Sequence, residues 1–215
     1  MGEDLPSFID TRWNAVLLVG PTGAGKTPLG QVLQAEGLWD WRCLHFDFGR
    51  ELRQSIHNRT GLLTEGEREL VARMLQTGAL LEDKHFPIAR KLLDAFMQAH
   101  QAGHETLIVL NGLPRHIGQA RVMQALVHMR AVISLECTPE VVLERIRTNA
   151  GGDREGRIDD SLQEVKSRLK TFTKRTSLLL RFYRELQVRI INVPVQADTG
   201  AQQVYALLEQ FGCAD

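Results

Sequence analysis

Gly20-Pro21-Thr22-Gly23-Ala24-Gly25-Lys26-Thr27 is the stretch that decides the fold, because its glycines, lysine and threonine have the GxxxxGK[ST] spacing of a phosphate-binding loop. It follows Ala15-Val16-Leu17-Leu18-Val19, an apolar run that predicts a strand, and a helical pattern begins after it. Glycines let successive backbone N–H groups turn towards phosphate oxygens, and Lys26 adds a charge for the β- and γ-phosphates. The Thr27 hydroxyl is placed to ligate Mg²⁺. We therefore expect a site for Mg-ATP with the contacts Gly20, Thr22, Gly23, Ala24, Gly25, Lys26, Thr27 and Pro28.

Pro28, directly after this loop, permits two interpretations. Proline is acceptable in the first turn of a helix, so Pro28 can start the helix at no cost. Proline also lacks the N–H that would face the α-phosphate, and its presence would then loosen the grip on the nucleotide. The sequence leaves both interpretations open.

Five apolar runs of strand length alternate with longer amphipathic stretches. They are residues 15–19, 44–48, 106–110, 131–135 and 188–193. Their content of Val, Ile and Leu is typical of parallel strands that are covered on both faces. The alternation predicts an α/β fold, a doubly wound three-layer α/β/α arrangement with a five-stranded parallel sheet, in a single domain over residues 1–215. A glycine-rich polar segment, Asn149 to Gly156, predicts a loop between two helices.

The composition argues against several classes of function. The chain has 26 basic and 26 acidic residues, so no overall field favours nucleic acid or an anionic membrane. The cysteines (Cys43, Cys137 and Cys213) form no CxxC pair, and the seven histidines lack the spacing of zinc ligands. No apolar run approaches the length of a membrane span. We expect a monomeric cytoplasmic protein with no nucleic-acid or membrane partner.

Beyond the loop, the order of motifs resembles the nucleoside monophosphate (NMP) kinases, adenylate kinase most of all, from about Ala15 to Gln210. Four segments carry the resemblance: Asp47-Phe48-Gly49-Arg50, Thr77-Gly78-Ala79-Leu80-Leu81, Asn111-Gly112-Leu113-Pro114-Arg115 with Gln119, and Gly156-Arg157-Ile158-Asp159-Asp160 with Arg168. Arg145 resembles the family's arginine beside the lid. The resemblance implies a P-loop NTPase fold with an N-terminal extension over residues 1–13, a small NMP-binding helical insertion at about 45–85 and a short lid at about 147–157.

The resemblance also implies transfer of the γ-phosphate of Mg-ATP to AMP or another NMP, giving two diphosphates. The arginines and the P-loop lysine would be catalytic: Lys26, Arg115, Arg145, Arg157 and Arg168, with Arg145 also contacting ATP. The implied acceptor contacts are His45, Arg50, Ala79, Leu81, Gly112, Arg115, Gln119, Arg157 and Arg168, with Gln119 hydrogen-bonding the base. The chemistry agrees, because arginine presents a fork of donors to phosphate and an anionic acceptor needs no general base.

Several positions depart from the family pattern. The loop has Lys26-Thr27-Pro28 where adenylate kinase has Lys-Gly-Thr, so Thr27 replaces a glycine. Asn111 stands where an aspartate positions Mg²⁺ through water, so we expect weaker metal binding, with Asp47 and Asn111 both acting through water. His45 stands where a small hydroxyl residue contacts the acceptor base; it either contacts the base or is a strand histidine with a satisfied hydrogen bond. Asn149 stands where a second lid arginine is often found, and Arg147 or Arg154 could substitute for it.

Two other functions stay open. Thr27 and Gly30 are similar to the loop of shikimate kinase, which favours a P-loop kinase of a small metabolite with Asp47 as the base. The residues Pro28, Asn111 and Asn149 favour instead a nucleotide-binding regulatory protein with weakened kinase activity.

Overall fold

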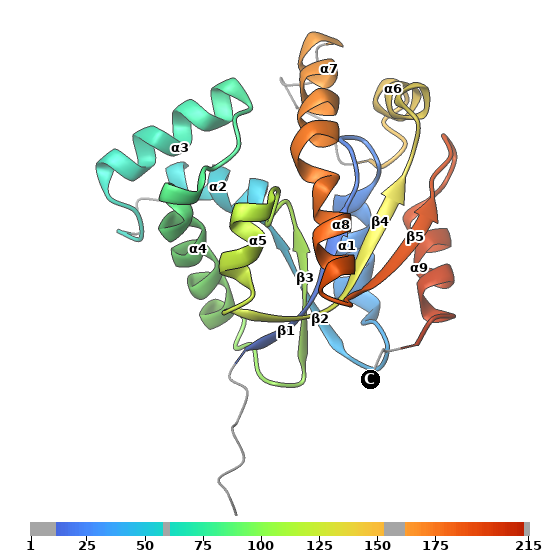
Figure 1. The fold of residues 1–215 in the computed structure, drawn as a ribbon, viewed down its shortest axis with the longest axis horizontal. Helices are drawn as coiled ribbons and strands as arrows, with labels where there is room; N and C mark the ends of the chain where they lie inside the picture. The colour runs from blue at the N-terminus through green and yellow to red at the C-terminus, as the bar shows by residue number, and fades with distance from the viewer. Residues whose placement is uncertain (1–11, 58–60, 153–161, 213–215) are drawn as a thin grey trace, which may run out of the picture.

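A five-stranded parallel sheet forms the centre of the computed structural model, which describes residues 12–57, 61–152 and 162–212 (Figure 1). The strand order is β2-β3-β1-β4-β5. The strands are β1 (Trp13–Val19), β2 (Arg42–Asp47), β3 (Thr106–Asn111), β4 (Val127–Glu136) and β5 (Arg189–Pro194). All four neighbouring pairs are parallel. The expected α/β fold with its five-stranded parallel sheet is confirmed.

β4 begins earlier than the apolar run predicts, at Val127 rather than Ala131. The first residues of the strand include polar side chains, so a prediction from continuous apolar runs does not include them. Its register with β1 shifts between Ala15 and Val16, so the strand contains an irregularity. Arg130 lies at this irregularity. Its Nε donates to Asn14 Oδ1 at 2.9 Å, which gives both polar side chains a hydrogen-bond partner.

Helices cover both faces of the sheet, as a near-continuous apolar strand requires. In β1, Ala15, Leu17 and Val19 face one core and Val16 and Leu18 face the other. The first core is completed by α4 (Phe86–Ala99), α5 (Ile117–Met123) and α8 (Leu178–Glu185). The second is completed by α1 (Lys26–Glu36) and α9 (Ala201–Glu209).

Two helices between β2 and α4 stand beside the sheet rather than on it (Figure 1). They are α2 (Phe48–His57) and α3 (Glu65–Thr77), followed by the short helix η1 (Asp83–His85). Thr64 caps α3: its Oγ1 accepts from the Glu67 N–H at 3.3 Å, and the Glu67 carboxylate accepts from the Thr64 N–H at 2.8 Å. These helices occupy the region in which the resemblance places the NMP-binding insertion.

The remaining helices follow β4. α6 (Pro139–Arg147) ends where the expected lid begins, and the lid residues 153–157 lie outside the described residues. α7 (Leu162–Thr171) continues through a π-helical segment, η2 (Phe172–Thr176), into α8. None of the helices in the described part of the chain combines the length and the apolar character that crossing a membrane requires.

Candidate active site

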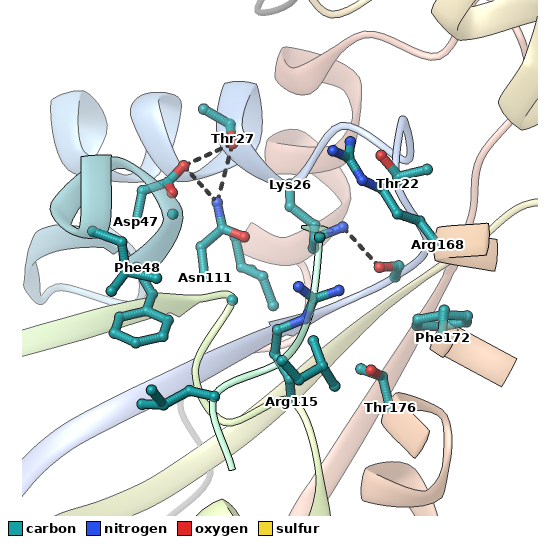
Figure 2. Close-up of a pocket in the computed structure, with 18 of the residues that line it drawn as sticks. Thr22, Lys26, Thr27, Asp47, Phe48, Asn111, Arg115, Arg168, Phe172 and Thr176 are labelled. Carbon is teal, nitrogen blue, oxygen red and sulfur yellow. Dashed lines mark hydrogen bonds between the residues drawn. The ribbon is translucent and has the colours of Figure 1, made fainter. Parts of the chain in front are cut away.

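A cavity of about 230 Å³ opens at the carboxyl ends of the central strands, where ligands commonly bind in open α/β sheets (Figure 2). Its walls come from the phosphate-binding loop, the ends of β2 and β3, the α2–α3 region and α7. Many residues singled out from the sequence line it together: Gly20, Thr22, Gly23, Gly25, Lys26, Thr27, Asp47, Ala79, Leu81, Asn111, Gly112, Arg115, Gln119 and Arg168. The cavity thus brings the expected donor and acceptor segments to one place.

The phosphate-binding loop turns sharply between β1 and α1. Gly25, directly before the helix, has φ 95°, a conformation that other residues rarely adopt, and a Cβ there would lie 3.2 Å from Nη2 of Arg145. Nζ of Lys26 donates to the carbonyl oxygens of Gly20 and Pro21, each at 2.7 Å. These bonds hold the ammonium group over the loop, where the β- and γ-phosphates of a nucleotide would bind.

Thr27, Asp47 and Asn111 form a hydrogen-bonded triangle at one end of the cavity (Figure 2). Oγ1 of Thr27 donates to Oδ2 of Asp47 at 2.9 Å, and Nδ2 of Asn111 donates to each of these oxygens at 3.1 Å. A P-loop hydroxyl beside a carboxylate is a suitable pair for Mg²⁺ that also contacts nucleotide phosphates. Since no cluster of three His, Cys, Asp or Glu side chains suited to a metal occurs among the described residues, Mg²⁺ would depend on this pair and on the phosphates.

Arg115 and Gln119 connect the end of β3 to the segment after α3. Oε1 of Gln119 accepts from the Arg115 N–H at 2.7 Å, and its Nε2 donates to the Leu81 carbonyl at 2.8 Å. One amide hydrogen and one acceptor position of Gln119 remain available for a ligand. Burial, with the nearby charge of Arg168, lowers the pKa of Arg115 to about 10. The cavity therefore contains a desolvated guanidinium beside a second one.

The other wall is one face of α7 and η2. Arg168 lines the cavity with Phe172 and Thr176, two residues that were not identified from the sequence (Figure 2). Thr176 is 7% exposed, and its hydroxyl has no hydrogen-bond partner among the described residues. Single π-helical turns are frequent at functional sites. The sequence could have indicated both residues through their spacing of i+4 and i+8 from Arg168, because this spacing places the three residues on one helical face.

The two arginines of α2 are placed differently from the expectation. Arg50, at the motif position, donates from Nη2 to the His45 carbonyl at 3.1 Å and lies outside the residues that line the cavity. Arg53, which no motif marks, lines the cavity instead. The structure therefore does not bring Arg50 together with Arg115 and Arg168.

His45 lies behind Asn111 and does not line the cavity. It is 1% exposed, and its Nε2 is 3.3 Å from Nδ2 of Asn111, while its Nδ1 has no partner in the described part of the chain. Burial lowers its pKa to about 4; the charge of Arg50 acts in the same direction and Asp47 opposes it. His45 is therefore a neutral strand histidine outside the cavity, which does not support a base contact; its contact with Asn111 involves only Nε2, so the hydrogen bonding of the structural interpretation is met at one ring nitrogen.

Arg145 lines a second, smaller cavity of about 100 Å³ with Ala24, Pro28 and Thr199. Its guanidinium donates to the carbonyl oxygens of Gly23, Gln196, Ala197 and Thr199 at 2.8–3.2 Å, and the residue is 4% exposed. It does not line the first cavity, so its expected catalytic role stays a prediction. Arg147 pairs with Glu144 on α6. Arg154 and Arg157 lie outside the described residues.

Comparisons with known proteins agree with this geometry. A family model described as adenylate kinase matches residues 18–188. An adenylate kinase from Cyanothece sp. is 31% identical over 178 residues, which cover 80% of this chain and 83% of that protein. An adenylate kinase from Xanthomonas campestris pv. campestris is 30% identical over 176 residues, covering 79% and 85%. A uridylate kinase from Saccharomyces cerevisiae is 24% identical over 201 residues, covering 93% and 91%.

Proposed function

The chain belongs to the adenylate kinase family, and on that premise we propose that it transfers the γ-phosphate of Mg-ATP to a nucleoside monophosphate, with AMP as the first candidate. The relatives named adenylate kinase support AMP, and the relative named uridylate kinase keeps UMP as an alternative acceptor. From the family resemblance we also propose that it acts on small-molecule nucleotides as a cytoplasmic monomer.

Arg115 carries the proposal. Its guanidinium is desolvated in the wall of the cavity and has neither a hydrogen-bond nor an ion-pair partner among the described residues. A half-buried cation without a counter-charge in a cavity wall is stabilised when a ligand supplies a negative charge. Arg168 is close enough to lower the pKa of Arg115, which makes this end of the cavity suited to a phosphate with more than one negative charge.

The donor would bind on the opposite wall. Lys26 and the backbone N–H groups of the phosphate-binding loop would hold the β- and γ-phosphates. Thr27 and Asp47 would hold Mg²⁺, which when bound neutralises charge on the phosphate oxygens. Transfer then needs two phosphates in line and arginines around the transferred group rather than a general base. Arg115 and Arg168 supply that charge from the acceptor side.

A panel of acceptors tests this function. Purified protein is mixed with ATP, Mg²⁺ and each of AMP, CMP, UMP, GMP and dTMP, and diphosphate formation is followed in a coupled assay. We expect diphosphate with at least one acceptor, and its loss in Lys26→Met. Lys84→Met, which removes a lysine that does not line the cavity, should keep the activity. No diphosphate from any of the five acceptors would refute the proposal.

A further inference from the structure

An ion pair outside the cavity joins two of the cavity's walls. Glu82 follows Leu81, which lines the cavity, and Arg175 precedes Thr176, which lines it from η2. Nη1 of Arg175 lies 2.6 Å from Oε1 of Glu82, and Nη2 lies 3.0 Å from Oε2. Each guanidinium arm binds its own carboxylate oxygen, which is the geometry in which such pairs are strongest. The two residues are 93 positions apart, so the pair connects distant segments of the chain.

Glu82 belongs to a segment that is attached to α5 on either side of it. The carbonyl oxygen of Leu81 accepts from Nε2 of Gln119 at 2.8 Å and lies 2.9 Å from Nε2 of His116. Nδ1 of His116 is in turn 3.5 Å from Oδ1 of Asp83. Displacing Glu82 would therefore also displace the carbonyl that orients the Gln119 side chain in the cavity wall.

Arg175 belongs to the opposite wall. Arg168 and Thr176 line the cavity from one face of α7 and η2, with Arg115 on the other side (Figure 2). Burial, with the charge of Arg168, lowers the pKa of Arg115 to about 10, so the two walls carry like charges that repel each other when no phosphate is bound. The pair of Glu82 and Arg175 joins the same two walls through opposite charges.

We propose that Glu82 and Arg175 are positioning residues for the acceptor, because their ion pair holds the two walls of its site together. The wall with Arg115 and Gln119 thereby keeps its spacing from Arg168. This assignment rests on the proposed function, because it concerns the acceptor side of the same cavity. Neither residue of the pair lines the cavity, so both act through the walls. Without the pair, part of the acceptor's binding free energy would be used to order the walls.

The two charges could also act through the electrostatic potential of the cavity, and the signs of the effects separate this from positioning. Removing the Glu82 carboxylate makes the cavity more positive and would strengthen the binding of a phosphate, whereas removing the Arg175 guanidinium would weaken it. Positioning requires that either removal weakens binding, because either one breaks the pair. The effect of Glu82→Gln therefore has opposite signs under the two explanations.

Four variants test the assignment: Glu82→Gln, Arg175→Gln, the two combined, and the exchanged pair Glu82→Arg with Arg175→Glu. The Michaelis constants for ATP and for the best acceptor of the panel are measured for each, and binding of that acceptor without ATP is measured by calorimetry. We expect each single variant to weaken acceptor binding by about threefold to fivefold, the upper range for an exposed pair, with the KM for ATP nearly unchanged.

The combined variant should bind the acceptor no more weakly than either single variant, because the pair is broken only once. The exchanged pair should recover most of the wild-type affinity, which general damage to the fold would not do. Arg181→Gln is the matched control, because Arg181 forms another exposed ion pair, with Glu185 at 2.8 Å, within α8 and outside the cavity wall. It should leave both Michaelis constants unchanged.

Acceptor binding that is unchanged in both single variants, or strengthened in Glu82→Gln, would overturn the assignment. An exchanged pair that binds the acceptor as weakly as the combined variant would also overturn it. If the wild-type protein binds and phosphorylates none of the five monophosphates, the proposed function itself fails. The two failures are therefore distinguishable.

Discussion

Replacing Gly30 by alanine should destabilise the protein, although alanine is the better helix former. Gly30 is buried in α1, directly over the ring of His45. A Cβ on residue 30 would lie 2.3 Å from Nε2, 2.4 Å from Cδ2 and 2.6 Å from Cε1 of that ring. Ordinary contacts between such atoms are about 3.5–4.0 Å, so either the ring or the helix would have to move. The ring has little room, because Asn111 lies 3.3 Å from its Nε2.

The size of the effect follows from two opposing terms. Overpacking of a core costs about 1–3 kcal/mol, and the helix propensity of alanine over glycine returns up to about 1 kcal/mol. We therefore expect Gly30→Ala to lower the free energy of unfolding by about 1–2 kcal/mol. In a His45→Ser background the clash is absent, and the same substitution should raise the free energy of unfolding by up to about 1 kcal/mol.

Urea unfolding of the four proteins in this double-mutant cycle measures the coupling between residues 30 and 45. Gly66→Ala is the control, because Gly66 lies in α3 and a Cβ there would meet nothing within 4 Å. That substitution should be neutral or stabilising. If Gly30→Ala destabilises the wild-type and His45→Ser proteins equally, the contact with His45 is not the reason for glycine at this position, and the reasoning is refuted.

Three further substitutions test the site. Thr176→Val should weaken acceptor binding about threefold to tenfold, with Thr176→Ser close to wild type, because only the hydroxyl is removed; equal effects of the two would indicate packing instead. Pro28→Thr should tighten ATP binding by up to about tenfold, because it restores an N–H in the first turn of α1 beside the second cavity; unchanged affinity in calorimetry would show that Pro28 only starts the helix. Asn111→Asp should lower the thermal midpoint of the protein without Mg²⁺, because it places a carboxylate oxygen about 3.1 Å from Oδ2 of Asp47. Added Mg²⁺ should restore the midpoint. Higher turnover with no loss of stability in the absence of metal would instead indicate a degraded kinase.

The sequence was sufficient for the features that depend on local pattern and chain order. All five strands, the phosphate-binding loop and the cavity that joins it to Arg115, Gln119 and Arg168 lie where motifs and apolar runs predict. The beginning of β4 was missed, because polar side chains interrupt the apolar run there. One of them, Arg130, is accommodated in the strand by its hydrogen bond to Asn14. Such a contact joins residues far apart in the chain, and no pattern within one strand reports it.

The sequence alone was least informative about which individual side chains reach the cavity. A motif identifies the turn of a helix that faces a ligand, but neighbouring side chains decide which arginine of that turn reaches it. Arg50 is held by Glu51 and the His45 carbonyl, which leaves Arg53 in the cavity wall. Thr176 carries no charge and belongs to no motif, so only its buried, unpartnered hydroxyl draws attention to it.

Gly30 and Thr27 first suggested a kinase of a small metabolite, and the structure gives Gly30 another reason. The glycine accommodates His45, so it carries no information about a shared acceptor. Both carboxylate oxygens of Asp47 are also engaged: Oδ1 accepts from the Arg50 N–H at 3.0 Å and Oδ2 from Thr27. Oδ2 is thus hydrogen-bonded to the hydroxyl that would ligate Mg²⁺ under the proposed function, and this arrangement fits a metal-positioning role for Asp47.

Two departures from the family pattern are in direct contact, which changes how both should be understood. Asn111 replaces an aspartate and Thr27 replaces a glycine, and Nδ2 of Asn111 donates to Oγ1 of Thr27 at 3.1 Å. Asp47 and Asn111 are opposite each other in the register of β2 and β3, so a second carboxylate would face the first across one strand pair. The amide removes that repulsion, while the added hydroxyl lies 2.9 Å from the remaining carboxylate and would offer Mg²⁺ an oxygen ligand under the proposed function. Under the proposed function, the pair would replace a carboxylate that positions Mg²⁺ through water by a hydroxyl that can ligate it directly, so Asn111 alone is not evidence for a kinase that has lost its metal site.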